Sequence, residues 1–289
     1  MPKLSEYKVK PWPNVLCTGD SGAGKSTFIG HGPQPSAWLL IDKDSPTIIE
    51  GVDPDVVFFK TYPPADVDLT KKDYLPPRNV ADDLIQDLQA IKNHFVSIMR
   101  GRPQPLKIKM MDGTIEEWPT PAMLVLEGAA PTSHQSANRI LHMNDKHAIE
   151  DFGNKLRFYD TRLQFLTNLY DMLLRLPCVV CVSTWGETDK TSQKVDGKVE
   201  LIDTGIIQPR FGGQLNDLIP GKFDSSFYFF VKNGFHYALT KDDDKHKGYK
   251  IGNIIGLPST LPMTIKTDEK TKTKINPCAD LWKLLLQQK

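Results

Sequence analysis

The chain has 289 residues, and its 36 Lys and Arg against 35 Asp and Glu leave a formal net charge of +1. This balance excludes a surface coated with positive charge, although it is compatible with a local basic groove for nucleic acid. The hydrophobic fraction of 39% predicts a sizeable core. No apolar run has the length of a signal peptide or a transmembrane segment, so we expect a soluble protein of the cytoplasm without a membrane partner.

The first motif in the chain is a glycine-rich loop that follows a polar arm at residues 1–13. Residues 14–18 predict a short buried strand, and a helix is expected to begin at Lys25. The loop between them fits the P-loop pattern G-x-x-x-x-G-K-[ST] without a mismatch. Its members are Gly19, Asp20, Ser21, Gly22, Ala23, Gly24, Lys25, Ser26 and Thr27.

The residue types of this loop suit a triphosphate with a divalent cation. Glycines allow a close wrap, so that backbone N–H groups can point at phosphate oxygens. Lys25 would neutralise the outer phosphates, and the Ser26 hydroxyl would ligate Mg²⁺. We expect the Lys25 side chain to be exposed before a ligand binds. The alternative is a glycine-rich turn that binds nothing.

Continuous apolar runs follow the loop, as in strands of a parallel sheet that is covered on both faces. Asp42 and Asp44 come directly after the first of them, at the end of a strand where α/β folds place their ligands. The alternative for these acids is a solvated turn. The expected elements are strands at 37–41 and 55–60, a loop at 61–79, a helix at 80–99, and a hairpin insertion at 106–118.

Another apolar run, residues 122–127, ends in Glu127. An apolar strand that ends in an acid downstream of a P-loop has the form of a Walker B strand, whose carboxylate supports the Mg²⁺ shell. That carboxylate is ordinarily Asp. Because Glu is one methylene longer, the ion or the backbone must shift to accommodate Glu127. The alternative role of Glu127 is to cap the loop that follows the strand.

Two long polar segments flank the clearest helix of the chain, which is expected at residues 155–176. The first, 129–154, carries three histidines without cysteine companions or ligand spacing, so we interpret them as surface residues. The second, 186–215, is rich in polar residues and Gly and predicts a long loop, either functional or disordered. The helix has an apolar stripe that should face the core, formed by Leu156, Tyr159, Leu163, Leu166, Tyr170 and Leu173.

The remaining runs complete a single domain. Cys178 and Cys181 lie in an expected strand, where residues three apart face opposite sides, so we expect buried thiols rather than a metal site. Two more strands are expected around a turn at Asn233-Gly234. The last expected parts are strands at 223–230 and 235–239, a charged turn at 241–247, a short strand at 249–251, an amphipathic piece at 281–286, and a C-terminal extension that covers 256–289.

From residue 12 to about residue 255, the order of these parts resembles a RecA-type ATPase core. Glu127 stands at the Walker B position, and Asp44 stands where the family has its catalytic carboxylate, with Asp42 as the reserve candidate. The segments 129–154 and 186–215 stand at the family's two DNA-binding loops. The compact size and the run at 219–224 are similar to small phage-encoded nucleotide-binding proteins, some of which are RecA-like single-strand annealing proteins.

The resemblance implies an α/β fold, with a RecA-like P-loop NTPase core, a mostly parallel central sheet flanked by helices, and a C-terminal antiparallel extension. It implies ATP and Mg²⁺ as cofactors, ATP hydrolysis by Lys25, Asp44 and Glu127, and single-stranded DNA as a partner. The setting would be phage recombination or replication in the host cytoplasm. A homo-oligomer, as a ring or filament, would supply a charge from the neighbouring subunit. The candidates for that charge are Arg210, Lys245, Lys247 and Lys250.

Three departures from the family pattern favour nucleotide binding over fast hydrolysis. Glu127 replaces an Asp, and Asp44 replaces a Glu. Trp185 lies near a position where Gln or His is common, which leaves Ser183 or Thr184 as the polar sensor, so slow turnover is expected. Two other functions stay open: a non-hydrolysing ATP-binding switch or assembly protein, and a P-loop phosphotransferase. The second is disfavoured because we see no basic lid segment with clustered arginines.

Overall fold

The computed structural model describes residues 12–41, 52–62, 80–144, 146, 149, 153–195, 198–212, 214–251, 254, 256–267 and 273–287. Their central feature is an eight-stranded sheet with the order β12-β11-β10-β1-β7-β6-β2-β3. Its strands are β1 (Asn14–Gly19), β2 (Ser36–Ile41), β3 (Val57–Tyr62), β6 (Met123–Glu127), β7 (Val179–Thr184), β10 (Ser225–Lys232), β11 (Phe235–Leu239) and β12 (Thr260–Pro262).

The sheet is parallel from β3 to β10, and β11 and β12 add an antiparallel edge. Every residue of β1, β2, β6 and β7 is buried, because their apolar runs leave no face for water. The predicted α/β class, the mostly parallel sheet and the antiparallel extension are therefore confirmed. The turn between β10 and β11 is also as predicted, with positive φ at Asn233 and Gly234.

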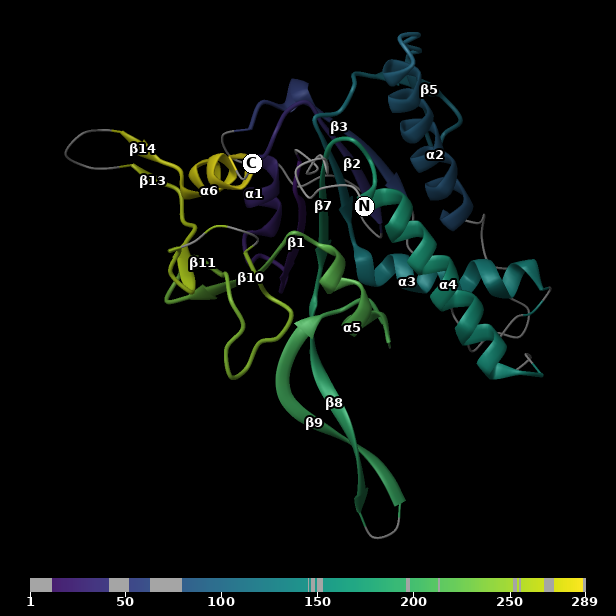
Figure 1. Cartoon of the computed structure of the whole chain (residues 1–289), viewed down its shortest axis with the longest axis vertical. Helices are drawn as coiled ribbons and strands as arrows, with labels where there is room; N and C mark the ends of the chain where they lie inside the picture. Colours follow the sequence, from purple (N-terminus) through teal and green to yellow (C-terminus); the bar gives the residue numbers. More distant parts are fainter. Residues whose placement is uncertain are drawn as a thin grey trace, which may run out of the picture.

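Helices cover both faces of the sheet (Figure 1). One core packs α2, α4 and part of α3 against alternate strand residues such as Leu39 and Leu124. The other packs α1 and α6 against residues of opposite parity such as Trp38 and Val125. The helices are α1 (Lys25–Gly30), α2 (Val80–Met99), α3 (Ala129–Met143), α4 (Lys155–Leu174), α5 (Leu215–Leu218) and α6 (Pro277–Leu286), with short 3₁₀ turns η2 (Pro54–Val56) and η4 (Pro220–Lys222).

Three small antiparallel pairs stand beside the main sheet. The predicted hairpin at 106–118 is present, and its Leu106, Ile108 and Trp118 are buried against α2, so this insertion contributes to the core. The pairs are β4 (Leu106–Lys109) with β5 (Ile115–Trp118), β8 (Gly186–Val195) with β9 (Lys198–Pro209), and β13 (Lys266–Thr267) with β14 (Lys274–Ile275).

A buried ion pair fastens α2 to the edge strand β3. Lys60 and Asp87 form the pair, and the Tyr62 hydroxyl donates to the same Asp87 carboxylate oxygen at 2.5 Å. Burial raises the pKa of Asp87, against the hydrogen bonds from Lys60 and Tyr62 that lower it. With its partners in place, this cluster orients α2 on the sheet, and removal of one partner would leave a buried charge uncompensated.

The polar segment after β6 is a helix, so the predicted loop is wrong for residues 129–143. Several of its polar side chains are buried, including Thr132, Ser133 and Ser136. The Thr132 hydroxyl donates to the Gly128 carbonyl at 2.8 Å, and Ser136 donates to the Ser133 carbonyl at 2.6 Å. Hydroxyl side chains can bond to backbone carbonyls within one helical turn, so a helix can form here from a largely polar sequence.

The polar segment after β7 is a β-ribbon, so the predicted loop at 186–215 is wrong as well. Strands β8 and β9 pair from Gly186 with Pro209 to Val195 with Lys198, with an irregularity between Thr188 and Lys190. Figure 1 shows the ribbon projecting away from the sheet. A two-stranded ribbon in solvent has no buried face, so it carries little of the apolar alternation that identifies a strand.

Smaller predictions met mixed outcomes. The predicted apolar stripe of α4 is buried only in the second half of the helix. Its first two residues, Leu156 and Tyr159, are 75% and 49% exposed. The expected strand at 249–251 is reduced to an isolated bridge between Ser226 and Lys250. All four cysteines are buried free thiols, as expected for Cys178 and Cys181. None of the helices in the described ranges is long and apolar enough to span a bilayer.

The C-terminal helix α6 buttresses the helix that follows the glycine-rich loop. The Trp282 ring stacks on Phe28 with centroids 4.9 Å apart, and its indole N–H donates to the Phe28 carbonyl at 2.8 Å. Both side chains are buried, at 2% and 0% exposure. The C-terminal extension thus supports α1 directly.

Replacing Trp282 tests this support. We expect Trp282→Ala to lower the free energy of unfolding by about 3–5 kcal/mol, because it empties a large buried site. Trp282→Phe keeps an aromatic ring and loses the indole donor, so its cost should be smaller, about 1–3 kcal/mol. Urea unfolding followed by circular dichroism measures both. A loss below 1 kcal/mol for Trp282→Ala would show that α6 does not support α1.

Candidate functional site

A pocket of about 690 Å³ opens at the carboxyl ends of the parallel strands. This volume lies within the roughly 300–1,000 Å³ typical of small-molecule sites. Parallel pairing brings the ends of β1, β7 and β6 to the same edge of the sheet. The pocket is lined by Asp20, Ser21, Gly22, Ala23, Gly24, Lys25, Ser26, Thr27, Ile41, Glu127, Gly128, Ala130, Pro131, Ser183, Thr184, Trp185 and His236.

The glycine-rich loop begins where the backbone leaves β1. Gly19 has φ of 144°, and a Cβ there would lie 2.2 Å from the Phe229 carbonyl oxygen on the neighbouring strand β10. Only glycine permits this approach. The loop therefore turns directly from the buried strand into the pocket, and all of its residues from Asp20 to Thr27 line the cavity.

The Lys25 side chain is folded against its own loop. Its ammonium group donates to the carbonyl oxygens of Gly19 at 2.6 Å and Asp20 at 2.7 Å. The residue is only 9% exposed, so the expectation of an exposed lysine is wrong. The reason is physical: the tight loop turns carbonyls toward the ammonium, which would otherwise lose its hydration without compensation. A positive charge is nevertheless held at the pocket wall.

Ser26 and Glu127 meet across the pocket. The Ser26 hydroxyl donates to a Glu127 carboxylate oxygen at 3.0 Å, although the residues lie 101 positions apart. Glu127 is 5% exposed, at the end of a fully buried strand. A hydroxyl oxygen and a carboxylate oxygen are hard ligands, and Mg²⁺ commonly uses one or two carboxylates with phosphates and waters. The predicted pair therefore fits this ion.

A dense protein cage for a metal is not part of this site. In the described part of the chain, no three His, Cys, Asp or Glu side chains gather into a group that could hold an ion. Mg²⁺ does not require such a cage when a triphosphate supplies the remaining oxygens. The hydroxyl of Ser26 and the carboxylate of Glu127 suit an ion that is bound together with a triphosphate.

The end of β7 supplies the polar sensor candidates. Ser183 pairs with Glu127 in register, and Ser183 and Thr184 both line the pocket. The Thr184 hydroxyl donates to the carbonyl of Arg210, at the base of the ribbon. Within the described ranges, the Ser183 hydroxyl has no such protein partner, so Ser183 is the candidate that can turn to a ligand.

Trp185 covers the side of the pocket next to the ribbon. It is 48% exposed, and the Arg210 guanidinium lies 6.0 Å from its ring centre, within the range of a cation–π contact. The Nε atom of Arg210 also lies 3.9 Å from Oε2 of Glu187, in an ion pair. Arg210 is a predicted candidate to act in the site of a neighbouring subunit. In this structure it contacts Trp185, a pocket residue of its own chain.

The predicted catalytic acids follow β2 in the sequence. Asp42 and Asp44 lie outside the described residues, so their assignment stays a prediction. Ile41, directly before them, ends β2 and lines the pocket. Two of the lysines proposed to supply a charge to a neighbouring subunit, Lys247 and Lys250, line a separate cavity together with Gln208 and Pro209 at the base of the ribbon. The Lys250 ammonium donates to the Gly221 carbonyl at 3.4 Å.

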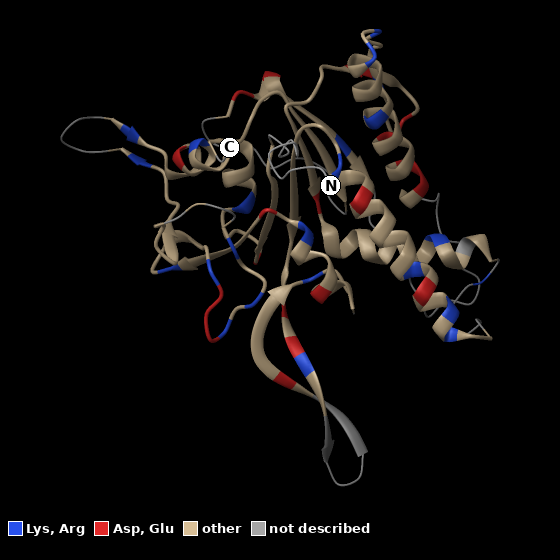
Figure 2. Cartoon of the chain, viewed as in Figure 1, with Lys and Arg blue, Asp and Glu red and all other residues tan. Residues whose placement is uncertain are grey.

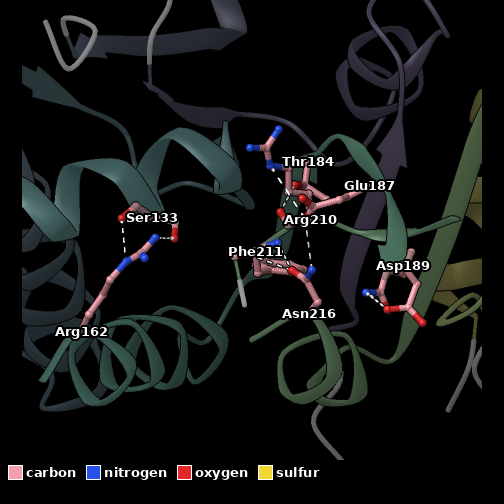
Figure 3. A network of polar contacts seen from close by, with 10 residues as sticks. Ser133, Arg162, Thr184, Glu187, Asp189, Arg210, Phe211 and Asn216 are labelled. Atoms are coloured by element: carbon pink, nitrogen blue, oxygen red, sulfur yellow. Dashed lines mark hydrogen bonds and ion pairs between the residues drawn. The ribbon is translucent and has the colours of Figure 1, made fainter. Parts of the chain in front are cut away.

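A polar network joins the pocket rim to the base of the ribbon, and a separate polar contact joins α3 to α4 (Figure 3). Asn216 accepts hydrogen bonds from the backbone N–H groups of Phe211 and Gly212, at 2.6 and 2.8 Å, and donates to Glu187 at 3.2 Å. On the far side, the Arg162 guanidinium donates to the Ser133 carbonyl and hydroxyl. The hydrogen bonds of Asn216, together with that of Thr184, hold the base of the ribbon at a defined place beside the pocket.

Cys17, beneath the loop, takes no part in this chemistry. It is fully buried, and burial raises the pKa of its thiol well above the ordinary value. The thiol therefore stays protonated at neutral pH and is inert. His236 is a pocket residue that the sequence did not predict. It follows the predicted Asn233-Gly234 turn, but no sequence pattern shows that this turn lies beside the glycine-rich loop.

Neither the protein-family models nor the curated protein sequences compared with this chain gave a match.

The charge of Glu127 can be tested separately from its shape. Glu127→Gln keeps an acceptor for Ser26 but removes the negative charge, so binding of inorganic tripolyphosphate with Mg²⁺ should weaken about 10- to 100-fold. Binding in EDTA should change much less. Isothermal titration calorimetry measures both. Glu117→Gln, on the exposed hairpin, is the matched control. Equal Mg²⁺ dependence in Glu127→Gln and the unaltered chain would exclude a metal role for Glu127.

Proposed function

We propose that the chain is a P-loop ATPase that binds ATP with Mg²⁺ and hydrolyses it. The observation that carries this proposal is the convergence of three groups on one pocket. Lys25 holds a positive charge at its wall, and Ser26 and Glu127 bring hard oxygen ligands within 3.0 Å of each other. A glycine-rich turn that binds nothing would not require the carboxylate of a distant strand to meet the loop.

The proposed mechanism assigns each group one task. Backbone N–H groups of residues 20–26 cradle the phosphates, and Lys25 exchanges its loop carbonyls for phosphate oxygens. Bound Mg²⁺ supplies neutralisation of the charge that develops on the outer phosphates. Ser26 and Glu127 orient that end of the ligand. Asp44, with Asp42 as the reserve candidate, is proposed to orient the attacking water.

The arrangement of the sheet supports a RecA-like core as the framework. The P-loop strand β1 is separated from the Glu127 strand β6 by β7, whose end carries Ser183 and Thr184. The antiparallel strands β11 and β12 follow on the other side of β1. This order agrees with the parts on which the resemblance rests. Assembly into a ring or filament, and a role in phage recombination or replication in the host cytoplasm, belong to the same proposal.

Single-stranded DNA is the proposed partner, with the ribbon β8–β9 as the contact. Figure 2 shows acidic as well as basic residues on the described part of this ribbon. Residues 186–209 contain three lysines, Lys190, Lys194 and Lys198, and five acids, Glu187, Asp189, Asp196, Glu200 and Asp203. Because phosphate contacts dominate affinity for nucleic acid and set its salt dependence, three lysines among five acids imply weak binding through few phosphate contacts.

Replacing Lys25 tests the ATPase assignment. We expect Lys25→Ala to reduce phosphate release from ATP at least about 100-fold, as loss of a charge-stabilising donor does in other enzymes. Because the substitution also removes two hydrogen bonds within the loop, thermal melting must accompany the assay. Lys283→Ala, 70% exposed on α6, is the control. Unaltered turnover in a folded Lys25→Ala variant would refute the site.

The same assay separates the alternatives. Stimulation of phosphate release by single-stranded DNA supports the proposed function. Consumption of ATP only with a small acceptor would instead indicate a phosphotransferase. Binding of ATP without any turnover would indicate the non-hydrolysing switch. Size measurement in parallel reports whether ATP changes the oligomeric state.

The ribbon lysines give an independent test of the partner. Neutralising Lys190, Lys194 and Lys198 to Gln should weaken binding of single-stranded DNA and reduce the slope of log affinity against log salt by about 0.7 for each lost phosphate contact. Fluorescence anisotropy across a salt series measures both. Neutralising Asp189 and Asp203 on the same ribbon should act in the opposite direction. An unchanged affinity and slope in the lysine variant would remove the ribbon from the DNA contact.

A further inference from the structure

We infer that His236 contacts the nucleoside part of the bound triphosphate and thereby sets which triphosphates the pocket accepts. This inference rests on the proposed function and deepens it, because it assigns the second end of the same ligand. It starts from the position of the imidazole, which among the described residues is the one pocket-lining side chain contributed by the antiparallel extension.

The backbone of His236 is fixed at the edge of the sheet where the loop lies. Gly19 pairs with Phe229 on β10, and His236 pairs with Val231, two residues further toward the pocket. The His236 N–H donates to the Thr264 hydroxyl at 2.8 Å, and its carbonyl accepts from the Met263 N–H at 2.8 Å. The imidazole therefore emerges from a held strand rather than from a mobile loop.

The imidazole packs directly against the phosphate loop. Gly24 has φ of 96°, and a Cβ at this position would lie 3.2 Å from Nδ1 of His236. A Cβ at position 24 would require the ring to shift by a few tenths of an ångström, and the positive φ independently favours glycine there. The ring and the loop thus form one continuous wall of the pocket.

The two ring nitrogens of His236 have different surroundings. Nδ1 is buried, and no hydrogen-bond partner for it exists among the described residues. A buried N–H without an acceptor is costly, so the neutral ring keeps its proton on Nε2. Nε2 is not among the buried unpartnered atoms, and the ring lines the cavity. Within the described residues, His236 therefore presents a donor to the pocket.

The position of the metal ligands decides which part of the triphosphate lies at His236. Glu127 is on β6, two strands from β1 on one side, and His236 is on β11, two strands from β1 on the other side. The backbones of these two strands are four strand spacings of about 4.8 Å apart. Both side chains nevertheless contact the same loop, Glu127 at Ser26 and His236 beside Gly24. Because Ser26 and Glu127 hold the outer phosphates and the loop holds the inner ones, the nucleoside must extend toward β11.

The chemistry of the contact follows from this placement. An Nε2–H donor suits a ribose hydroxyl oxygen or an acceptor nitrogen or oxygen on the edge of the base. On this placement its contact is separate from those to the phosphates, which belong to Lys25 and the loop. His236 is therefore expected to raise affinity for a nucleotide over that for the bare polyphosphate chain.

Titration calorimetry with two ligands, ATP and inorganic tripolyphosphate, both with Mg²⁺, tests this division. His236→Ala should weaken ATP binding about 10-fold and leave tripolyphosphate binding unchanged. His236→Gln, whose amide N–H can stand in for Nε2–H, should recover part of the loss. His134→Ala, an exposed histidine on α3, is the control. Deoxy-ATP and GTP then show whether the sugar or the base loses its partner.

The remaining outcomes each overturn a defined statement. An equal loss for both ligands in His236→Ala would mean that His236 contacts phosphate or shapes the loop, and the inference would be wrong. No loss for either ligand would remove His236 from the contact. If the unaltered chain binds tripolyphosphate as tightly as ATP, nucleoside recognition is absent while the phosphate site stands. If it binds neither, the proposed function fails and the inference falls with it.

Discussion

The parallel pairing of β1 with β7 and β10 is the constraint on which the candidate site depends. This pairing brings the end of β1, where the loop begins, level with Ser183 and Thr184 on one side and with Phe229 on the other. Because β6 pairs with β7 in the same direction, Glu127 arrives at that edge too. A shift of one residue in any of these strands would turn the site residues to the other face of the sheet.

The site is rigid on its supporting side. Phe28 in α1 packs on Phe227 and Phe229 of β10 and on Trp282 of α6, so the helix after the loop is held from two directions. Lys25 is held by loop carbonyls, and Glu127 by its buried strand. Buried groups with satisfied partners lose little entropy when a ligand arrives, which is the advantage of a preorganised pocket.

Among the described elements, the ribbon β8–β9 projects away from the sheet and the helices that cover it (Figure 1). It is attached through a polar network at its base, where Thr184, Arg210, Glu187 and Asn216 meet (Figure 3). Thr184 belongs both to the pocket and to this network. A ligand that displaces Thr184 would therefore act on the attachment of the ribbon. Such a link gives a physical route from the pocket to a partner bound on the ribbon.

The sequence alone determined the buried parallel strands, the helix at Val80–Met99, the hairpin turns and the glycine-rich loop between β1 and α1, because these follow from local apolar patterns and turn chemistry. It also indicated Ser26 and Glu127 as partners. It could not predict α3 or the ribbon, since buried hydroxyls bonded to the backbone and a strand pair in solvent carry no apolar period. Only the tertiary structure decided that Lys25 is folded onto its loop and that His236 stands beside Gly24. Those contacts depend on which strands become neighbours, and local sequence patterns do not predict strand order.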